Sequence, residues 1–558
     1  MKDSREFFLN SIMLKSAITA VIIAVFLFFT SAYIALKMGA LPWPIIFSII
    51  VSAGLLRLVN DLSPNKVNIA QAGGSIGGLM AAAVVFTLPG LILENPTLFP
   101  HGWLALICLC GAILGIGLSI PLRKEYVIKR NLPYPAGRAG GEVIKTGFNQ
   151  SHRFDLMIIF GLLAAIFTLG RDALSWNYIN LGAVGSQSIL ILIMPMVIAT
   201  GIILGSANSF SWGAGGILSV IAAVVLITMF DGTDVTLKIQ NFGMGLVIGS
   251  GIGYILMHAG SPLPTKSIIL KQQPWVWGIT LISGLLLFFI GIPLFAVALC
   301  LILTFITVNL ASRMTGLTNI DPLEQFGLLS TLLITFFFGL ANLEISLEHR
   351  YIITFFIATA TAIAGDIGHD YKSAQIVGTD HKQIVIVDII AAVAVALMIP
   401  ALFSVIQSPV IAEKLFTHEF PAPQAQIVAA NLQGLPHPRV FMSGLILAII
   451  IEAFRSRGKF FSIHLMPLGI GLFLGFNLAI LIAIGGFIAL RASKNGPEQV
   501  LTAIVISAAV LGGEGTIGFL QSTVKVFFPA KETVILGSIA LLLITLLARS
   551  IRGHFQKP

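Results

Sequence analysis

The sequence predicts an all-α, polytopic transmembrane helical bundle of about 16 helices, and two observations support this fold class. The first is composition: 56% of the 558 residues are hydrophobic and 10% are charged, whereas soluble domains carry roughly 25% charged residues. The second is that apolar runs of about 17 to 25 residues recur along the chain, and a helix of that length crosses a ~30 Å hydrocarbon core. The lipid bilayer is therefore the expected solvent for most of the chain, in the cell (inner or plasma) membrane.

The predicted spans follow one another with short connections. In the first half the apolar runs cover 17–38, 40–56, 76–94, 103–121, 155–174, 184–205, 210–229 and 240–258. In the second half they cover 275–292, 294–311, 325–343, 350–365, 383–407, 440–456, 463–490, 499–523 and 532–550. The run at 463–490 is either one long helix or two short helices joined at Gly475. These are 17 runs, whereas termini on the same side of the membrane require an even number of crossings. We therefore expect 16 crossings, with one run re-entrant or broken.

Charge gives the expected orientation. The net charge is +9, and Lys and Arg come in short bursts between apolar runs, as at 123–130 and 549–557. This is the pattern of cytoplasmic loops under the positive-inside rule, so both termini are expected in the cytoplasm and no nucleic-acid partner is expected. The three cysteines lie inside apolar runs and predict neither disulfides nor a metal site.

Short strings in the first half are echoed in the second. GSIG at 74–77 resembles GDIG at 365–368, ALKMG at 35–39 resembles ASRMTG at 311–316, and the string at 135–147 resembles that at 421–434. The three offsets, about 291, 276 and 286 residues, are close to half the chain length. They predict an internally duplicated bundle, with an N-terminal transmembrane repeat at 1–270 and a C-terminal repeat at 271–558, the construction usual in secondary transporters.

The segment 364–378 concentrates ionisable residues directly after an apolar run. Asp366, His369 and Asp370 are spaced i, i+3 and i+4, which places them on one helical face, and Lys372 follows. Two glycines in this segment permit close backbone approach or a helix break. We interpret it as a substrate or proton site at a broken helix, where a histidine between carboxylates suits proton coupling. The alternative is a solvated loop end.

The segment 131–147 begins with two prolines around Tyr134. Arg138, Glu142 and Lys145 follow at i, i+4 and i+7, on one face of a predicted helix. These charges either contact a solute or are simply solvated on a cytoplasmic amphipathic helix.

Two further segments carry polar groups in apolar surroundings. Asn68 and Gln71 open a run of small residues at 68–78, which predicts either tight helix packing or an unwound stretch that lines a cavity. Glu514 lies between glycines at 512–515 and is either a site residue or a loop residue.

No enzyme motif is present. The sequence has no HExxH and no Walker lysine, and we expect no GxSxG string to serve as a nucleophile site. The GxGD pattern of intramembrane aspartyl proteases fails because residue 363 is Ile. We therefore expect no catalytic residues, no bound cofactor and no metal site. A secondary transporter is the preferred interpretation; a channel or passive facilitator and a membrane-embedded enzyme are the alternatives.

The chain resembles the oligopeptide transporter (OPT) family, which includes the yellow stripe-like transporters. The similarity rests on SAYIALKMGALPWP at 31–44, NIAQAGGSIGGLMAAAVVFTLPGL at 68–91, LPYPAGRAGGEVIKTG at 132–147, GMGLVIGSGIGYIL at 243–256 and GDIGHDYKSAQIVGT at 365–379. The chain has no NPG or KIPPR string, which favours the prokaryotic and yellow stripe-like branch.

The resemblance implies a proton-coupled symporter that imports small oligopeptides or metal complexes of peptide-like chelators, of the siderophore or nicotianamine type. The proton gradient would be its driving force. The family motifs map onto residues of the segments 131–147 and 364–378, namely Tyr134, Pro135, Gly137, Glu142, Lys145, Asp366, Asp370, Lys372 and Gly378. The chain departs from the pattern at Ala136, Arg138 and His369, and the cation at Arg138 favours a more anionic solute. A homo-oligomer is compatible with the sequence, which does not fix the number of copies.

Overall fold

The computed structural model describes residues 2–39, 45–94, 100–146, 151–184, 187–229, 234–258, 272–319, 321, 323–417, 419–455 and 464–555. Residues 40–44 and 147 of the family strings and the end of the basic tail, 556–558, lie outside this set. The described chain is almost entirely helical, and its named strands form one two-stranded sheet. The all-α fold class is confirmed.

Twelve helices of the described chain are long and apolar enough to cross a membrane. The number rises to 13 if the neighbouring helices Pro423–Gln433 and Pro438–Arg455 form one span, and shorter apolar helices occur as well. This confirms a polytopic membrane protein. The expected total of about 16 helices is not confirmed by this count.

The chain forms two compact units, and each takes one segment from each half of the sequence. Unit 1 comprises 1–151 and 263–432, and unit 2 comprises 152–262 and 433–558. The compact units are thus not the consecutive halves 1–270 and 271–558. The internal duplication remains a prediction that concerns the order of helices along the chain.

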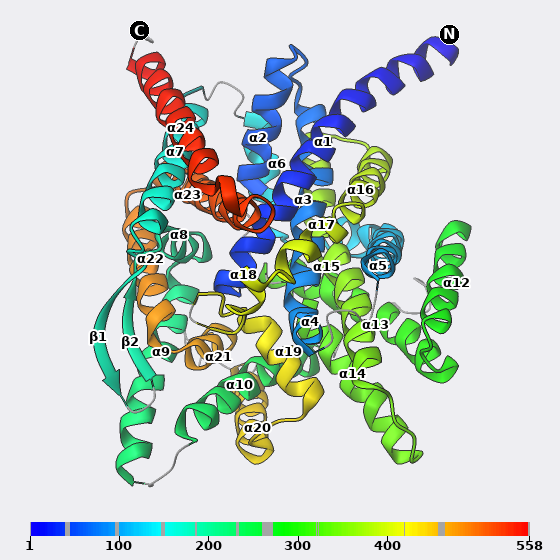
Figure 1. The fold of residues 1–558 in the computed structure, drawn as a ribbon. Helices are drawn as coiled ribbons and strands as arrows, with labels where there is room; N and C mark the ends of the chain where they lie inside the picture. Colours follow the sequence, from blue (N-terminus) through cyan, green and yellow to red (C-terminus); the bar gives the residue numbers. More distant parts are fainter. Residues whose placement is uncertain are drawn as a thin grey trace. The chain divides into compact units, whose positions relative to one another are not determined.

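The named secondary-structure elements of unit 1 are all helices among its described residues (Figure 1). Its first segment contains α1 (Lys2–Met38), α2 (Ile45–Leu58), α3 (Pro64–Thr87), α4 (Pro89–Glu94), α5 (His101–Leu122), the π-helical turn η1 (Arg123–Lys129) and α6 (Pro135–Thr146). Its second segment contains α12 (Pro274–Phe289), α13 (Leu294–Thr318), α14 (Leu323–Leu340), α15 (Leu347–Val377), α16 (His381–Ala396), α17 (Ile399–Ile406), α18 (Pro409–Ala412) and α19 (Pro423–Gln433).

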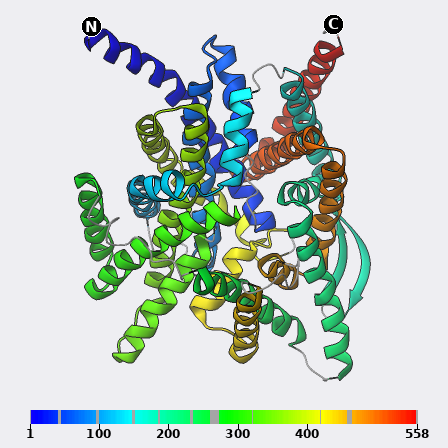
Figure 2. The ribbon, with the colours of Figure 1, turned by 180° about the vertical axis from the view of Figure 1, so that it is seen from behind.

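Helices α3 and α15 form the centre of unit 1. Every residue of α3 from Val67 to Thr87 is buried. The helix begins where Ser63 caps it, accepting a hydrogen bond from the Lys66 backbone N–H, with Pro64 at its first position. The sequence placed the start of this span at residue 76, so the helix begins about three turns earlier than expected. It packs against α1, α15 and α16, and Figure 2 shows α16 beside α1 and α3 from behind.

Glycines let these helices approach closely. A Cβ on Gly77 of α3 would lie 1.8 Å from the Ala24 carbonyl oxygen of α1. Of the two readings of the small-residue run at 68–78, the structure shows tight packing in an unbroken helix.

The expected helix break in the segment 364–378 is wrong. Helix α15 runs without interruption to Val377 and ends at Gly378, which adopts the left-handed conformation (φ +87°). Gly365 and Gly368 lie within the helix, where the missing Cβ atoms make room for the Asp321 carboxylate and the Tyr134 ring. Helical backbone satisfies its own hydrogen bonds in the membrane, so close packing here needs no unwinding.

Unit 2 contains the remaining helices and a β-hairpin. Its first segment contains α7 (Ser151–Ala173), strands β1 (Tyr178–Val184) and β2 (Gln187–Leu192), α8 (Pro195–Leu204), α9 (Ser206–Met229) and α10 (Val235–His258). Its second segment contains α20 (Pro438–Arg455), α21 (Leu465–Leu474), α22 (Phe476–Lys494), α23 (Pro497–Phe527), the 3₁₀ turn η2 (Pro529–Lys531) and α24 (Glu532–Phe555). The helix expected at 184–205 is therefore wrong in its first part, since strand β2 precedes Pro195 and the helix begins there.

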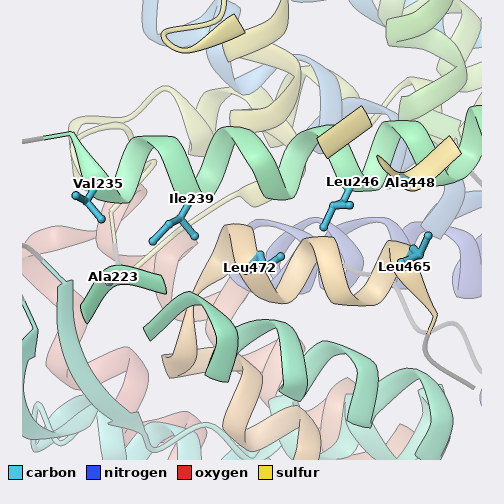
Figure 3. Close-up of a cluster of buried hydrophobic side chains, with 7 residues drawn as sticks. All are labelled: Ala223, Val235, Ile239, Leu246, Ala448, Leu465 and Leu472. Carbon is cyan, nitrogen blue, oxygen red and sulfur yellow. The ribbon is translucent and has the colours of Figure 1, made fainter. Parts of the chain in front are cut away.

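Two glycine breaks divide apolar runs of unit 2. Gly205 (φ +79°) separates α8 from α9, and Gly475 (φ +74°) separates α21 from α22. The second break confirms the two-helix reading of the run at 463–490. Helices α10 and α21 pack together through Leu246, Ile239 and Leu472, as Figure 3 shows.

Candidate functional site

Polar side chains meet in register along the buried interface of α3 and α15. The Gln71 amide donates to Asp370 Oδ1 at 2.9 Å, and the Ser373 hydroxyl donates to Asn68 Oδ1 at 2.7 Å. The third pair is Asp366 with the Ser75 hydroxyl. From one pair to the next, the residue number rises on α15 (366, 370, 373) and falls on α3 (75, 71, 68). The two contacting helices therefore run antiparallel. We call this set the polar ladder: Asn68, Gln71, Ser75, Asp366, Asp370 and Ser373.

The ladder leaves polar atoms without partners among the described residues. These are Asn68 Nδ2, Gln71 Oε1 and Asp370 Oδ2. Asn68 and Gln71 are fully buried, and Asp370 is 1% exposed, whereas Asp366 is partly exposed. An unsatisfied buried polar group costs about 1–3 kcal/mol, and more if it is charged. Unpaired donors and acceptors of this kind mark a position where a proton, water or solute group completes the bonding.

His369 faces α6 instead of the ladder. Its Nδ1 accepts a hydrogen bond from the Gly137 backbone N–H at 3.2 Å, and its ring packs edge-to-face on Tyr134 with 5.4 Å between centroids. A nitrogen that accepts a backbone N–H carries no proton, so the imidazole is uncharged in this conformation. His369 thus fixes α6 against α15 in this state.

Tyr134 anchors the start of α6. Its backbone N–H donates to the Gly316 carbonyl at 2.9 Å, and its hydroxyl donates to the Ser312 carbonyl at 2.7 Å. Burial raises the pKa of Tyr134, which keeps the hydroxyl protonated as a donor. Its ring occupies the space left by Gly368, where a Cβ would lie 2.2 Å from the ring. Residues of the two family motifs therefore contact each other directly.

Other predicted site residues lie at the edge of this region. The Lys372 ammonium donates to Asn131 Oδ1 at 2.6 Å. Arg138 and Glu142 pair with each other at 3.0 Å on the outer face of α6, with 66% and 56% of their side chains exposed. The structure places these two charges on a solvated helix face, apart from the buried ladder.

Asp321, which the sequence did not single out, lies near Asp366 and has both carboxylate oxygens buried. The Asp321 carboxylate packs on α15 so closely that a Cβ on Gly365 would lie 2.7 Å from Oδ2, and neither oxygen has a partner among the described residues. Burial raises the pKa of Asp321 well above its usual range, and the Asp366 and Glu324 carboxylates raise it further. Asp321 follows α13 in what reads as a loop, so hydropathy gave no signal for it.

Glu514 belongs to unit 2 and forms a separate arrangement. It lies inside helix α23, where it is fully buried, so the loop alternative is wrong. Its side chain pairs with Arg171 of α7, and its Oε2 accepts the Met196 backbone N–H at 2.8 Å. Glu514 therefore caps the N-terminus of α8, where a negative charge is favoured. The sequence gave one overlooked signal, an arginine in the last turn of a predicted span.

The described residues contain no candidate metal site. Within the part of the chain that the structure describes, no group of three His, Cys, Asp or Glu side chains is arranged to hold a metal ion. The free cysteines Cys108, Cys110 and Cys300 are buried.

Comparison with known proteins decides the family. A family model described as "OPT oligopeptide transporter protein" matches residues 12–261 and 199–525. The chain belongs to the oligopeptide transporter family. It is also similar to a Haemophilus influenzae protein named "Putative oligopeptide transporter", with 24% identity over 587 residues that cover 88% of this chain and 91% of the relative. Membership of the OPT family confirms the resemblance found in the sequence and makes the chain a multi-pass transporter, not an enzyme.

Proposed function

We propose that this OPT transporter is a proton-coupled symporter that imports small oligopeptides or peptide-like metal chelates, driven by the proton gradient. The observation that carries the proposal is the buried Asp370, whose Oδ2 has no partner among the described residues while Oδ1 binds Gln71. An ionised carboxylate in such surroundings costs several kcal/mol. The group therefore takes up a proton or a substrate ammonium.

Four residues of the ladder have proposed roles. Asp366 and Asp370 exchange protons or bind the amino group of the solute, and Asn68 and Gln71 supply amide contacts through their unpaired atoms. Asp366 is partly exposed and gives the buried Asp370 a neighbour closer to solvent. His369 and Tyr134 position α6. Lys372 lies at the edge of the site, where its ammonium is held by the Asn131 side chain.

The solute class comes from the relatives. The family description and the name of the Haemophilus influenzae protein both specify oligopeptides. The yellow stripe-like character of the motifs adds metal chelates as a second solute class.

Uptake into proteoliposomes tests the proposal. A radiolabelled tripeptide, and in a parallel arm a ferric complex of a peptide-like chelator, is supplied with and without an acidic exterior. We expect the pH gradient to stimulate wild-type uptake. In Asp370→Asn the stimulation should fall by about tenfold, a loss equal to ~1.4 kcal/mol of driving free energy. Counterflow exchange should persist in this variant because exchange moves no net protons.

The matched control is Glu413→Gln, which removes an exposed carboxylate of unit 1 and should leave uptake unchanged. Uptake by the wild type that ignores the pH gradient would remove the coupling claim. Flux that never saturates with solute concentration would favour the channel or passive facilitator.

A further inference from the structure

A further buried carboxylate, Asp388 of α16, lies beside the polar ladder. Asp388 is 0% exposed, and neither of its oxygens has a hydrogen-bond partner among the described residues. It interacts electrostatically with Asp366 and Asp370 of α15. A lone ionised carboxylate in a low-dielectric interior is strongly unfavourable, and the group takes up a proton instead.

No counter-ion pairs with Asp388 among the residues that the structure describes. From α15 it faces Asp366, Asp370 and the phenol of Tyr371. The neighbouring faces of α1 and α3, around Val387, present apolar side chains and the backbone of Gly73.

The nearby cation is directed elsewhere. The Arg123 guanidinium, at the end of α5, lies 6.0 Å from the centroid of the Tyr371 ring. Asp388 therefore differs from Asp370, which keeps one oxygen on Gln71. In this conformation we expect both carboxylates to be neutral.

We propose that Asp388 is a second proton-binding site of the transporter, separate from Asp370, so that more than one proton accompanies each solute molecule. This inference rests on the proposed proton-coupled symport and deepens it. The two carboxylates lie on different helices, α15 and α16. Asp370 has one oxygen without a hydrogen-bond partner among the described residues, and Asp388 has two. When the site opens to water, both lose their protons, in sequence because they are like charges.

The test measures how far uptake proceeds before it stops. Proteoliposomes with the membrane potential clamped at zero receive a fixed pH gradient and a labelled tripeptide, and the limiting inside-to-outside peptide ratio is recorded. Each coupled proton multiplies that ratio by the proton ratio, so a gradient of one pH unit contributes a factor of about ten per proton. The proteins compared are the wild type, Asp388→Asn and the control Glu413→Gln.

We expect the wild type and Glu413→Gln to accumulate peptide beyond the one-proton limit. Asp388→Asn should reach a ratio about tenfold lower at that gradient while still exchanging peptide. A wild-type ratio at the one-proton limit would overturn the inference and leave proton coupling intact. A ratio independent of the gradient would instead overturn the proposed function itself.

Infrared spectroscopy of the purified protein provides a readout that needs no substrate and no transport. The C=O band of protonated carboxyl groups at neutral pH should weaken in Asp388→Asn and separately in Asp370→Asn. A band unchanged in Asp388→Asn would show that Asp388 holds no proton, and it would overturn the inference even if the variant exchanges peptide poorly.

Discussion

Unit 1 uses the same backbone joint twice, and only one of the two joints carries a large side chain. Tyr134 (φ +38°), just before α6, donates its N–H to the Gly316 carbonyl at the end of α13. Ala422 (φ +41°), just before α19, donates its N–H to the Leu36 carbonyl at the end of α1. We call these the α6 joint and the α19 joint.

The two joints differ in what their side chains contact. Positive φ is costly for both residues, by roughly 1–2 kcal/mol, so each joint is held by its surroundings. At the α19 joint the side chain is a methyl group. At the α6 joint a phenol ring reaches α15 and packs on Gly368 and His369, next to the acids. The shared geometry supports the predicted duplication, and the added ring links one copy to the polar ladder.

The largest expected effect comes from Gly137→Ala in α6. The new Cβ would lie 2.2 Å from the His369 carbonyl oxygen, and backbone on both sides prevents relief without moving α6 away from α15. We expect a loss of about 3 kcal/mol, measured as a lower midpoint of thermal unfolding in detergent. Gly102→Ala is the matched control because a Cβ there meets nothing within 4 Å. Equal midpoints for the two variants would contradict the packing of the α6 joint.

The next effect concerns Asp321. It lies two residues after Asn319, whose side chain contacts the α6 joint by accepting a hydrogen bond from the Ala136 N–H. The pKa of Asp321 is higher in the folded than in the unfolded protein. Its ionisation therefore does not affect stability below the unfolded pKa, and it destabilises the fold as the pH rises above that value. Asp321→Asn should therefore stabilise the protein at neutral pH and leave it unchanged near pH 3. Thermal unfolding of both proteins across this range checks the sign; stabilisation that is equal at both ends would show that ionisation is not the cause.

Tyr134→Phe should have a smaller effect. It removes the hydroxyl that donates to the Ser312 carbonyl and keeps the ring, so we expect a loss of about 1 kcal/mol. The corresponding change at the other joint, Ala422→Gly, should be close to neutral, since relief of positive φ is offset by greater freedom of the unfolded chain. Chemical denaturation of both variants measures the contrast. A larger loss at Ala422 would reverse the proposed specialisation.

The smallest effect is expected for Arg138→Ala. Its ion pair with Glu142 is exposed, and such pairs contribute at most about 1 kcal/mol. Stability and gradient-driven uptake should both match the wild type. Loss of uptake with stability unchanged would bring the outer face of α6 into the solute pathway.

Much of the α15 contribution was visible in the sequence because charged residues are rare and costly in a membrane helix. Asp366 and Asp370 stand out in an apolar run on that ground. Spacing along one helix says nothing about partners on another, so it did not reveal that His369 turns to α6. Spacing also did not show which face of α6 is buried. The structure shows that the buried face is the one where Gly137 contacts the backbone of α15.

Other features had no local signal. The strands β1 and β2 are rich in Ile, Leu and Val, and over so short a run these residues fit a strand or a helix equally well. Asn68 and Gln71 lowered the apparent hydropathy of α3 and shortened its predicted span, although both are buried in it. Asp321 was hidden because burial of a loop acid depends on tertiary packing.

The long separation of Gln71 and Asp370, 299 residues apart in the chain, has a consequence for biosynthesis. At roughly 5–20 residues per second, a ribosome needs about 15 to 60 s to make the intervening polypeptide. During that interval Gln71 of α3 has been synthesised, but its hydrogen-bond acceptor Asp370 has not. The packing of this helix is therefore incomplete until the second half of the protein has been translated, and in a truncated product Gln71 would lack Asp370.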